Sequence, residues 1–203
     1  MDYTSIAVAL AVVLGSLTVH EMAHAWTADR LGDPTARLLG RVSLNPWVHI
    51  DPFGTVLLPL IAAFSGLPII GWAKPVPVNT SRLREPRRDF MLVAAAGPAS
   101  NLILATLASV GLHLSGVVHT AGVFDLLGQV LVINIFLAVF NMIPVPPLDG
   151  GNVLAGLLPR QAASIFVMLR PYGFIVLYAL MFTGALSAIV VPPASFLIGL
   201  LLP

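Results

Sequence analysis

The chain has 203 residues, of which 58% are hydrophobic and only 9% are charged, and its formal net charge is +1. A soluble domain carries about 25% charged residues because its surface faces water, so this composition excludes an ordinary soluble protein and indicates an integral membrane protein. The small net charge gives no indication of a nucleic-acid partner. The absence of cysteine excludes disulfides and thiolate metal sites, which leaves nitrogen and oxygen as metal ligands.

Six apolar segments follow one another along the chain, and a bilayer core of about 30 Å requires roughly 20 residues of helix. The second segment is interrupted by prolines and a glycine. The sixth is short and split by Pro192–Pro193, so it either spans the membrane, re-enters it or lies at the interface. We predict an all-α polytopic membrane protein with five or six transmembrane segments, drawn from residues 4–28, 53–71, 90–112, 123–142, 163–185 and 186–202.

Two polar stretches, 29–52 and 72–89, are too short to fold alone. Turn residues and prolines within them favour short membrane-associated strands or re-entrant elements at 40–46 and 72–79. We therefore expect one membrane-embedded domain over 1–203, with a motif-bearing core at about 4–158 and C-terminal helices at about 163–202. Basic clusters at 30–41, which includes Arg41, and at 74–88 are typical of cytoplasmic loops, and their charges are interpreted as solvated.

The segment His20-Glu21-Met22-Ala23-His24 has the HExxH pattern. Residues four apart share a helix face, so both imidazoles can reach one metal ion, and Glu21 is placed to take a proton from a metal-activated water. The motif lies inside the first apolar segment, which argues against a cleavable signal there and makes isolated ionisable groups costly. The alternative is a chance match whose histidines bond to backbone or line a pore.

A catalytic zinc site usually has three protein ligands, so a third ligand is sought. Asp149 differs from the other acidic residues because it follows a membrane segment directly, within a run rich in proline and glycine. Its alternative role is a helix N-cap for a short helix at 150–158. Because two histidines require a third ligand, we assign Asp149 to the metal.

These residues resemble the site-2 protease family of intramembrane metalloproteases. The resemblance rests on His20–His24 together with the run from Asn141 through Pro144 and Pro146 to Leu148-Asp149-Gly150. Gly97-Pro98-Ala99-Ser100-Asn101 is similar to the Gly-x-x-x-Asn element of the middle core helix in that family. The stretches 40–52 and 71–79 also look like the compact prokaryotic members.

The resemblance implies a three-helix catalytic core with one zinc ion held by His20, His24 and Asp149, and with Glu21 as the base. It also implies hydrolysis of transmembrane segments of membrane-protein substrates, in regulated intramembrane proteolysis and within a prokaryotic cell membrane. Asn141 aligns with an asparagine thought to help hold substrate or the transition state. Asn101 is a weaker candidate of the same kind.

The chain also departs from larger members of the family. Its HExxH motif falls in the first apolar segment, it has no PDZ or CBS domain, and the 53–71 segment separates the first two motifs. Two other functions remain open at this stage. Buried histidines and broken apolar segments also fit a cation transporter or channel, and an inactive homologue would serve as a membrane scaffold.

Overall fold

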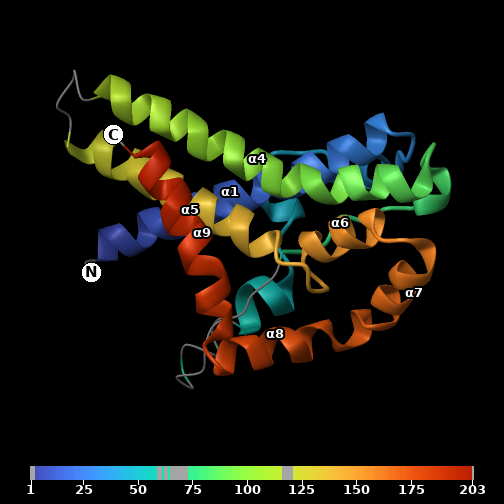
Figure 1. Cartoon of the computed structure of the whole chain (residues 1–203). Helices are drawn as coiled ribbons and strands as arrows, with labels where there is room; N and C mark the ends of the chain where they lie inside the picture. The colour runs from blue at the N-terminus through green and yellow to red at the C-terminus, as the bar shows by residue number, and fades with distance from the viewer. Residues whose placement is uncertain (1–2, 59–60, 62–63, 65–72, 116–120, 203) are drawn as a thin grey trace.

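Three long helices form the centre of the molecule. The computed structural model describes residues 3–58, 61, 64, 73–115 and 121–202. Within them, α1 (Tyr3–Arg30), α4 (Pro86–Ser115) and α5 (Ala121–Asn141) pack against one another in all three pairings. Figure 1 shows α4 running beside α1 and α5. Each of the three is long and apolar enough to cross a membrane.

The ends of α1 and α4 follow from local sequence. Helix α1 ends just before Gly32, whose backbone φ of 112° is one that residues other than glycine rarely adopt. Helix α4 begins with a proline, whose missing N–H is not needed at the first helical position. The carboxylate of Asp89 accepts a hydrogen bond from the backbone N–H of Glu85 at 2.8 Å, which satisfies a donor at that helix end.

The two faces of α4 differ in side-chain size. The face toward the other helices is buried and carries small side chains such as Ala105, Ala108 and Ser109, beside Asn101 and Leu112. The opposite face carries large apolar residues that are each 52–67% exposed, namely Ile103, Leu107, Val110 and Leu114. Small residues allow close packing of membrane helices, and large apolar residues suit lipid. The pattern therefore fits a helix surrounded partly by lipid.

The shorter helices flank this core. Helix α2 covers Thr35–Leu38, and single turns occupy Pro46–Val48, Pro52–Leu57, Thr80–Arg82 and Arg170–Tyr172. Helix α6 (Asp149–Leu157) packs along α4, and α7 (Arg160–Met168) and α8 (Gly173–Phe182) then lead away from it. Helix α9 (Ala185–Leu201) returns to α5 (Figure 1). Buried Ala194 there joins the apolar cluster of Leu131 and Ile135.

The C-terminal third differs from the sequence prediction. The segment expected at 163–185 is divided into α7, a 3-10 turn and α8, and a left-handed Gly184 (φ 76°) ends α8. The turn with α8 forms an 80° bend with α9. The expected split at Pro192–Pro193 is wrong, because α9 continues through both prolines with the next residue, Ala194, fully buried. Proline fixes φ near its helical value, so packing on both sides can hold such a helix together.

The described residues contain three helices able to span a membrane, or four if the bent pair counts as one span. Five or six spans are therefore not confirmed. Most of the 53–71 segment lies outside the described residues. No strand occurs in the described ranges, so the strands expected at 40–46 and 72–79 are not seen there. Pro75 and Pro77 lack the N–H groups of a ladder, and within the described ranges the bond from Lys74 N to His49 O (2.8 Å) is the one backbone hydrogen bond between 40–52 and 72–79.

Asp33 joins two loops at the end of α1, and its removal should destabilise the fold. Its fully buried carboxylate accepts hydrogen bonds from Thr35 N (3.1 Å) and Asn79 N (2.6 Å). Asp33→Ala leaves these donors unpaired and is expected to lower the free energy of unfolding by about 2–3 kcal/mol, measured in mixed micelles. The exposed Asp125→Ala is the control, expected to change it by less than about 0.5 kcal/mol. Equal losses would contradict the role of Asp33.

Candidate metal centre

The two histidines of the HExxH motif lie on one face of α1 and point into the protein. His20 is 3% exposed and His24 is 7% exposed. Their ring centroids are 4.6 Å apart with the planes at 84°. The offset of four residues produces this pairing, because such residues lie one turn apart on the same side of a helix. Their Nε2 atoms are 3.0 Å apart, so both rings present the same nitrogen to one point.

Asp149 reaches the histidines because α6 begins there. The prolines of the preceding turn prevent α5 from continuing, and Gly150 lets the new helix start against that turn. A Cβ atom on Gly150 would lie 2.6 Å from the carbonyl oxygen of Ile143, which only glycine avoids. The N-cap residue of α6 is Leu148, so the alternative role of Asp149 as an N-cap is wrong.

The three candidate ligands converge on one small volume. Asp149 Oδ2 lies 3.1 Å from His20 Nε2 and 3.3 Å from His24 Nε2. One ligand atom from each residue falls within 4.8 Å of the others. Among the described residues, these three are the one cluster of at least three histidine or acidic side chains close enough to share a metal ion. The sequence prediction of these three residues as neighbours therefore matches the geometry.

The hydrogen bonds around the cluster determine where its protons lie. His24 Nδ1 is 2.7 Å from the carbonyl oxygen of Val93, which can only accept, so Nδ1 carries the proton. His20 Nδ1 is 2.6 Å from Asn101 Oδ1, which also accepts. Each neutral ring then has a free lone pair on Nε2. Asp149 Oδ2 is buried and receives no hydrogen bond. Three acceptors without a donor favour a cation at their centre.

Gly97 on α4 leaves the space that such a cation needs. A Cβ atom at this position would lie 2.5 Å from His20 Nε2 and even nearer to His24 Nε2. Imidazole nitrogens bind zinc at about 2.0–2.1 Å, so the absent methyl corresponds closely to the place of a metal ion. Two imidazoles and one carboxylate, without sulfur, are a donor set that suits zinc. The residues therefore fit a catalytic zinc ion with open coordination positions.

Glu21 follows the first histidine and is half-buried. Its negative charge acts on Arg41, which is only 5% exposed. Burial lowers the pKa of the Arg41 guanidinium, and attraction to Glu21 opposes that change. The interpretation of Arg41 as a solvated loop charge is therefore wrong. Arg41 donates through Nη2 to the carbonyl of Lys74, while its buried Nε has no hydrogen-bond partner.

The two asparagines predicted near the site have different surroundings. Asn101 is fully buried and contacts His20, so it holds a candidate ligand rather than facing a substrate. Asn141 donates through Nδ2 to the carbonyl of Leu137 at 2.9 Å, one turn earlier in α5. A third asparagine, Asn134, was not predicted although it is fully buried and accepts from Asn101 at 2.8 Å. A carboxamide in the middle of an apolar helix was the available signal.

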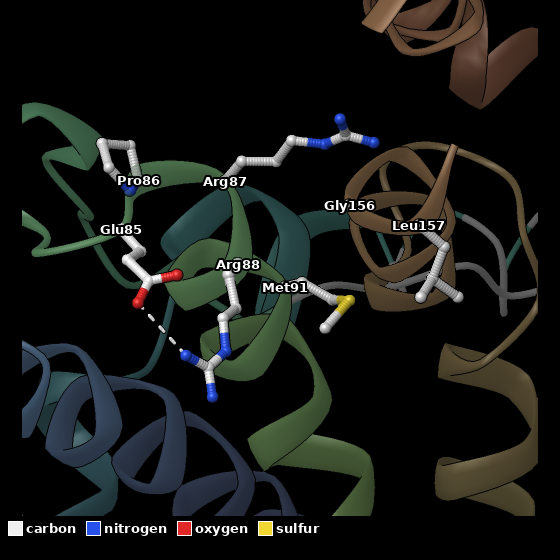
Figure 2. A pocket seen from close by; sticks show the side chains of 7 residues that line it. All are labelled: Glu85, Pro86, Arg87, Arg88, Met91, Gly156 and Leu157. Carbon is white, nitrogen blue, oxygen red and sulfur yellow. Dashed lines mark hydrogen bonds and ion pairs between the residues drawn. The ribbon is translucent and has the colours of Figure 1, made fainter. Parts of the chain in front are cut away.

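A separate pocket opens where α4 begins and α6 ends. Its volume is about 520 Å³, and none of the metal-cluster residues lines it. Figure 2 shows Arg87 extending over it and the ion pair of Glu85 with Arg88, whose atoms are 3.2 Å apart. The apolar part of its lining includes Met91 and Leu157. The pocket is therefore distinct from the metal centre, which is defined by its ligands.

Comparisons with known proteins agree with this chemistry. The model of Peptidase family M50 matches residues 8–117 and 109–183. YwhC of Bacillus subtilis, provisionally named a zinc metalloprotease, is 41% identical over 187 residues, or 87% of this chain and 81% of the relative. Rip2 of Mycolicibacterium smegmatis, with the same provisional name, is 31% identical over 176 residues, or 86% and 66%. No solved structure matches the chain.

Proposed function

This chain belongs to peptidase family M50, the site-2 protease family of zinc metalloproteases, and from that premise we propose that it cleaves transmembrane segments of other membrane proteins. We assign the metal to His20, His24 and Asp149 and the catalytic base to Glu21. The observation that carries the proposal is the convergence of the Nε2 atoms of His20 and His24 and one unbonded carboxylate oxygen of Asp149 on the same point.

The depth of this point supports a reaction within the membrane. His20 lies ten residues before Arg30, the end of the first candidate span, or about 15 Å along a helix. Gly97 lies eleven residues inside the span that starts at Pro86. The Asp149 side chain is 16% exposed, so the centre is not fully closed. A substrate helix hides its amides in its own hydrogen bonds and must unwind locally before it is cut.

The side chains divide the work of peptide hydrolysis between them. When bound, zinc would lower the pKa of a water molecule and polarise the scissile carbonyl. Glu21 takes the proton from the attacking water and then delivers it to the leaving amine, which keeps the proton count balanced. His20 keeps its Nδ1 proton and donates it in a hydrogen bond to Asn101, and His24 does the same to the carbonyl of Val93. Both rings therefore remain neutral ligands during the reaction.

The family and the bacterial relatives support a proposal for the cellular setting. We place the protein in a prokaryotic cell membrane as a multi-pass protein, with a transmembrane protein as substrate and lipid as its surroundings. Regulated intramembrane proteolysis is the process that we assign to it. The three apolar helices and the lipid-facing surface of α4 support this location.

Metal removal tests the proposed function. The full chain purified in detergent is expected to cleave a model transmembrane substrate, to lose this activity after treatment with a zinc chelator, and to regain it when zinc is added back. Cleavage measured by mass spectrometry should fall within the apolar segment of the substrate. Cleavage that survives complete zinc removal, or that occurs only in soluble flanking regions, would overturn the proposal.

A further inference from the structure

Four polar side chains form a continuous chain between the three long helices. Ser16 lies on α1, Asn101 on α4 and Asn134 on α5, and the chain ends at His20 on α1. All of them are buried, with exposures of 4% for Ser16, 3% for His20 and 0% for both asparagines. Such groups are costly among apolar helices unless each is bonded. Hydrogen bonds link all four side chains, which suggests that they do more than pack the helices together.

The direction of every bond in this chain is determined at one end. Asn134 Nδ2 lies 2.8 Å from the backbone carbonyl oxygen of Val130, which can only accept. The carboxamide of Asn134 must therefore turn its Oδ1 toward Asn101, 2.8 Å from Asn101 Nδ2. Asn134 Nδ2 also donates to Ser16 Oγ at 2.9 Å, a contact compatible with this orientation because a hydroxyl can either accept or donate.

The same logic passes through Asn101 to the metal ligand. Because Asn101 gives its Nδ2 to Asn134, its Oδ1 faces His20 Nδ1 at 2.6 Å. An acceptor at that place requires the proton on Nδ1 and leaves Nε2 of His20 free to bind metal. If Asn101 turned over, its NH₂ group would favour the tautomer with the proton on Nε2, which cannot bind a metal ion.

We propose that Asn134 is a positioning residue that sets the tautomer of His20 through Asn101 and thereby raises the zinc affinity of the site. The hydrogen bonds of the Asn134 side chain go to Asn101, Ser16 and Val130 rather than to the metal ligands, so it acts by holding one orientation of the Asn101 carboxamide. The proposal rests on the assignment of His20 as a zinc ligand. It adds a requirement for the relative placement of α1, α4 and α5, since the chain crosses all three helices.

Asn134→Leu tests the proposal by removing the acceptor for Asn101. With zinc removed, ¹⁵N-histidine labelling of the full chain in detergent should show His20 shifting toward the Nε2–H tautomer, with its signal assigned by its loss in His20→Gln. The dissociation constant for zinc, measured by competition with a chromogenic chelator, should rise about 10-fold, the lower end of the range for outer-shell partners of a metal ligand. An unchanged tautomer would overturn the proposal even if cleavage fell.

A second background separates positioning from general structural damage. Asn101→Asp places a carboxylate beside His20. An ionised carboxylate has two acceptor oxygens, so turning it over cannot present a donor to His20. In that background Asn134→Leu should leave the tautomer unchanged and raise the zinc dissociation constant by less than about 2-fold. An equal rise in both backgrounds would mean that Asn134 merely supports the helix packing, and would overturn the proposal.

Two further variants keep the test open if the leucine variant does not fold. Asn134→Ser removes the carboxamide with a smaller polar group, and the same tautomer shift is expected. Asn134→Asp keeps an acceptor opposite Asn101 and should retain the tautomer of the wild-type protein. A wild-type protein that binds no zinc, but shows the predicted tautomer changes, would reject the proposed function and overturn the effect of Asn134 on zinc affinity, while supporting its control of the His20 tautomer.

Discussion

Glu21→Gln is expected to reduce cleavage of a transmembrane substrate by at least about 10³-fold while the protein keeps its zinc. Glutamine has nearly the same shape as glutamate but cannot accept the proton of the attacking water. The proposed ligands His20, His24 and Asp149 are unchanged by the substitution, so metal affinity should stay within about 3-fold. Cleavage rate and zinc content are measured on the same purified sample.

Glu85→Gln is the matched control for this experiment. Glu85 is exposed at the start of α4 and pairs with Arg88 at 3.2 Å, away from the metal cluster. Its loss should leave both cleavage and zinc unchanged. A transporter would tolerate Glu21→Gln far better than a protease does, so equal activity of wild type and Glu21→Gln would remove Glu21 from the mechanism.

Gly97→Ala should have the second large effect, through the metal rather than through the base. The added methyl would lie 2.5 Å from His20 Nε2, close to the place that a zinc ion would take. Because α4 packs tightly against α1 at this point, we expect zinc affinity to fall by more than about 100-fold and cleavage to fall with it. Zinc content after dialysis against buffered zinc measures the loss.

Gly15→Ala controls for the general effect of alanine on a helix. Gly15 lies in α1, the helix that carries both histidines, and a Cβ atom at this position meets nothing within 4 Å. Its zinc content should equal that of the wild-type protein, and its stability should not fall, since alanine is the better helix former. Full zinc binding by Gly97→Ala would show that the ion lies elsewhere.

The central residues could be predicted from sequence because their geometry is local or specific. The spacing of His20 and His24 places both rings on one helix face without any knowledge of the fold. Asp149 was identifiable because it stands directly after an apolar segment, next to glycines that permit close approach. The family resemblance stated on these motifs is confirmed by the match to peptidase family M50.

The surrounding residues could not be predicted because they depend on contacts between helices. Asn101 and Asn134 are 33 positions apart and meet only when α4 packs on α5. Arg41 follows a loop glycine and shows no sequence sign that the fold buries it. The expected boundary at 185/186 lies next to the bend at Gly184, but the division of 163–185 into α7, a 3-10 turn and α8 was missed because hydropathy continues across it. Pro192–Pro193 suggested a break that packing of α9 prevents.

Zinc content of the purified full chain tests the central claim most directly. Metal analysis should find about one zinc ion per chain in the wild-type protein and in His113→Ala, a histidine at the far end of α4. His24→Ala should lose nearly all of its zinc, because one of three protein ligands is removed. Wild-type protein that holds no zinc, or His24→Ala that holds as much as the wild type, would contradict the assignment of this centre.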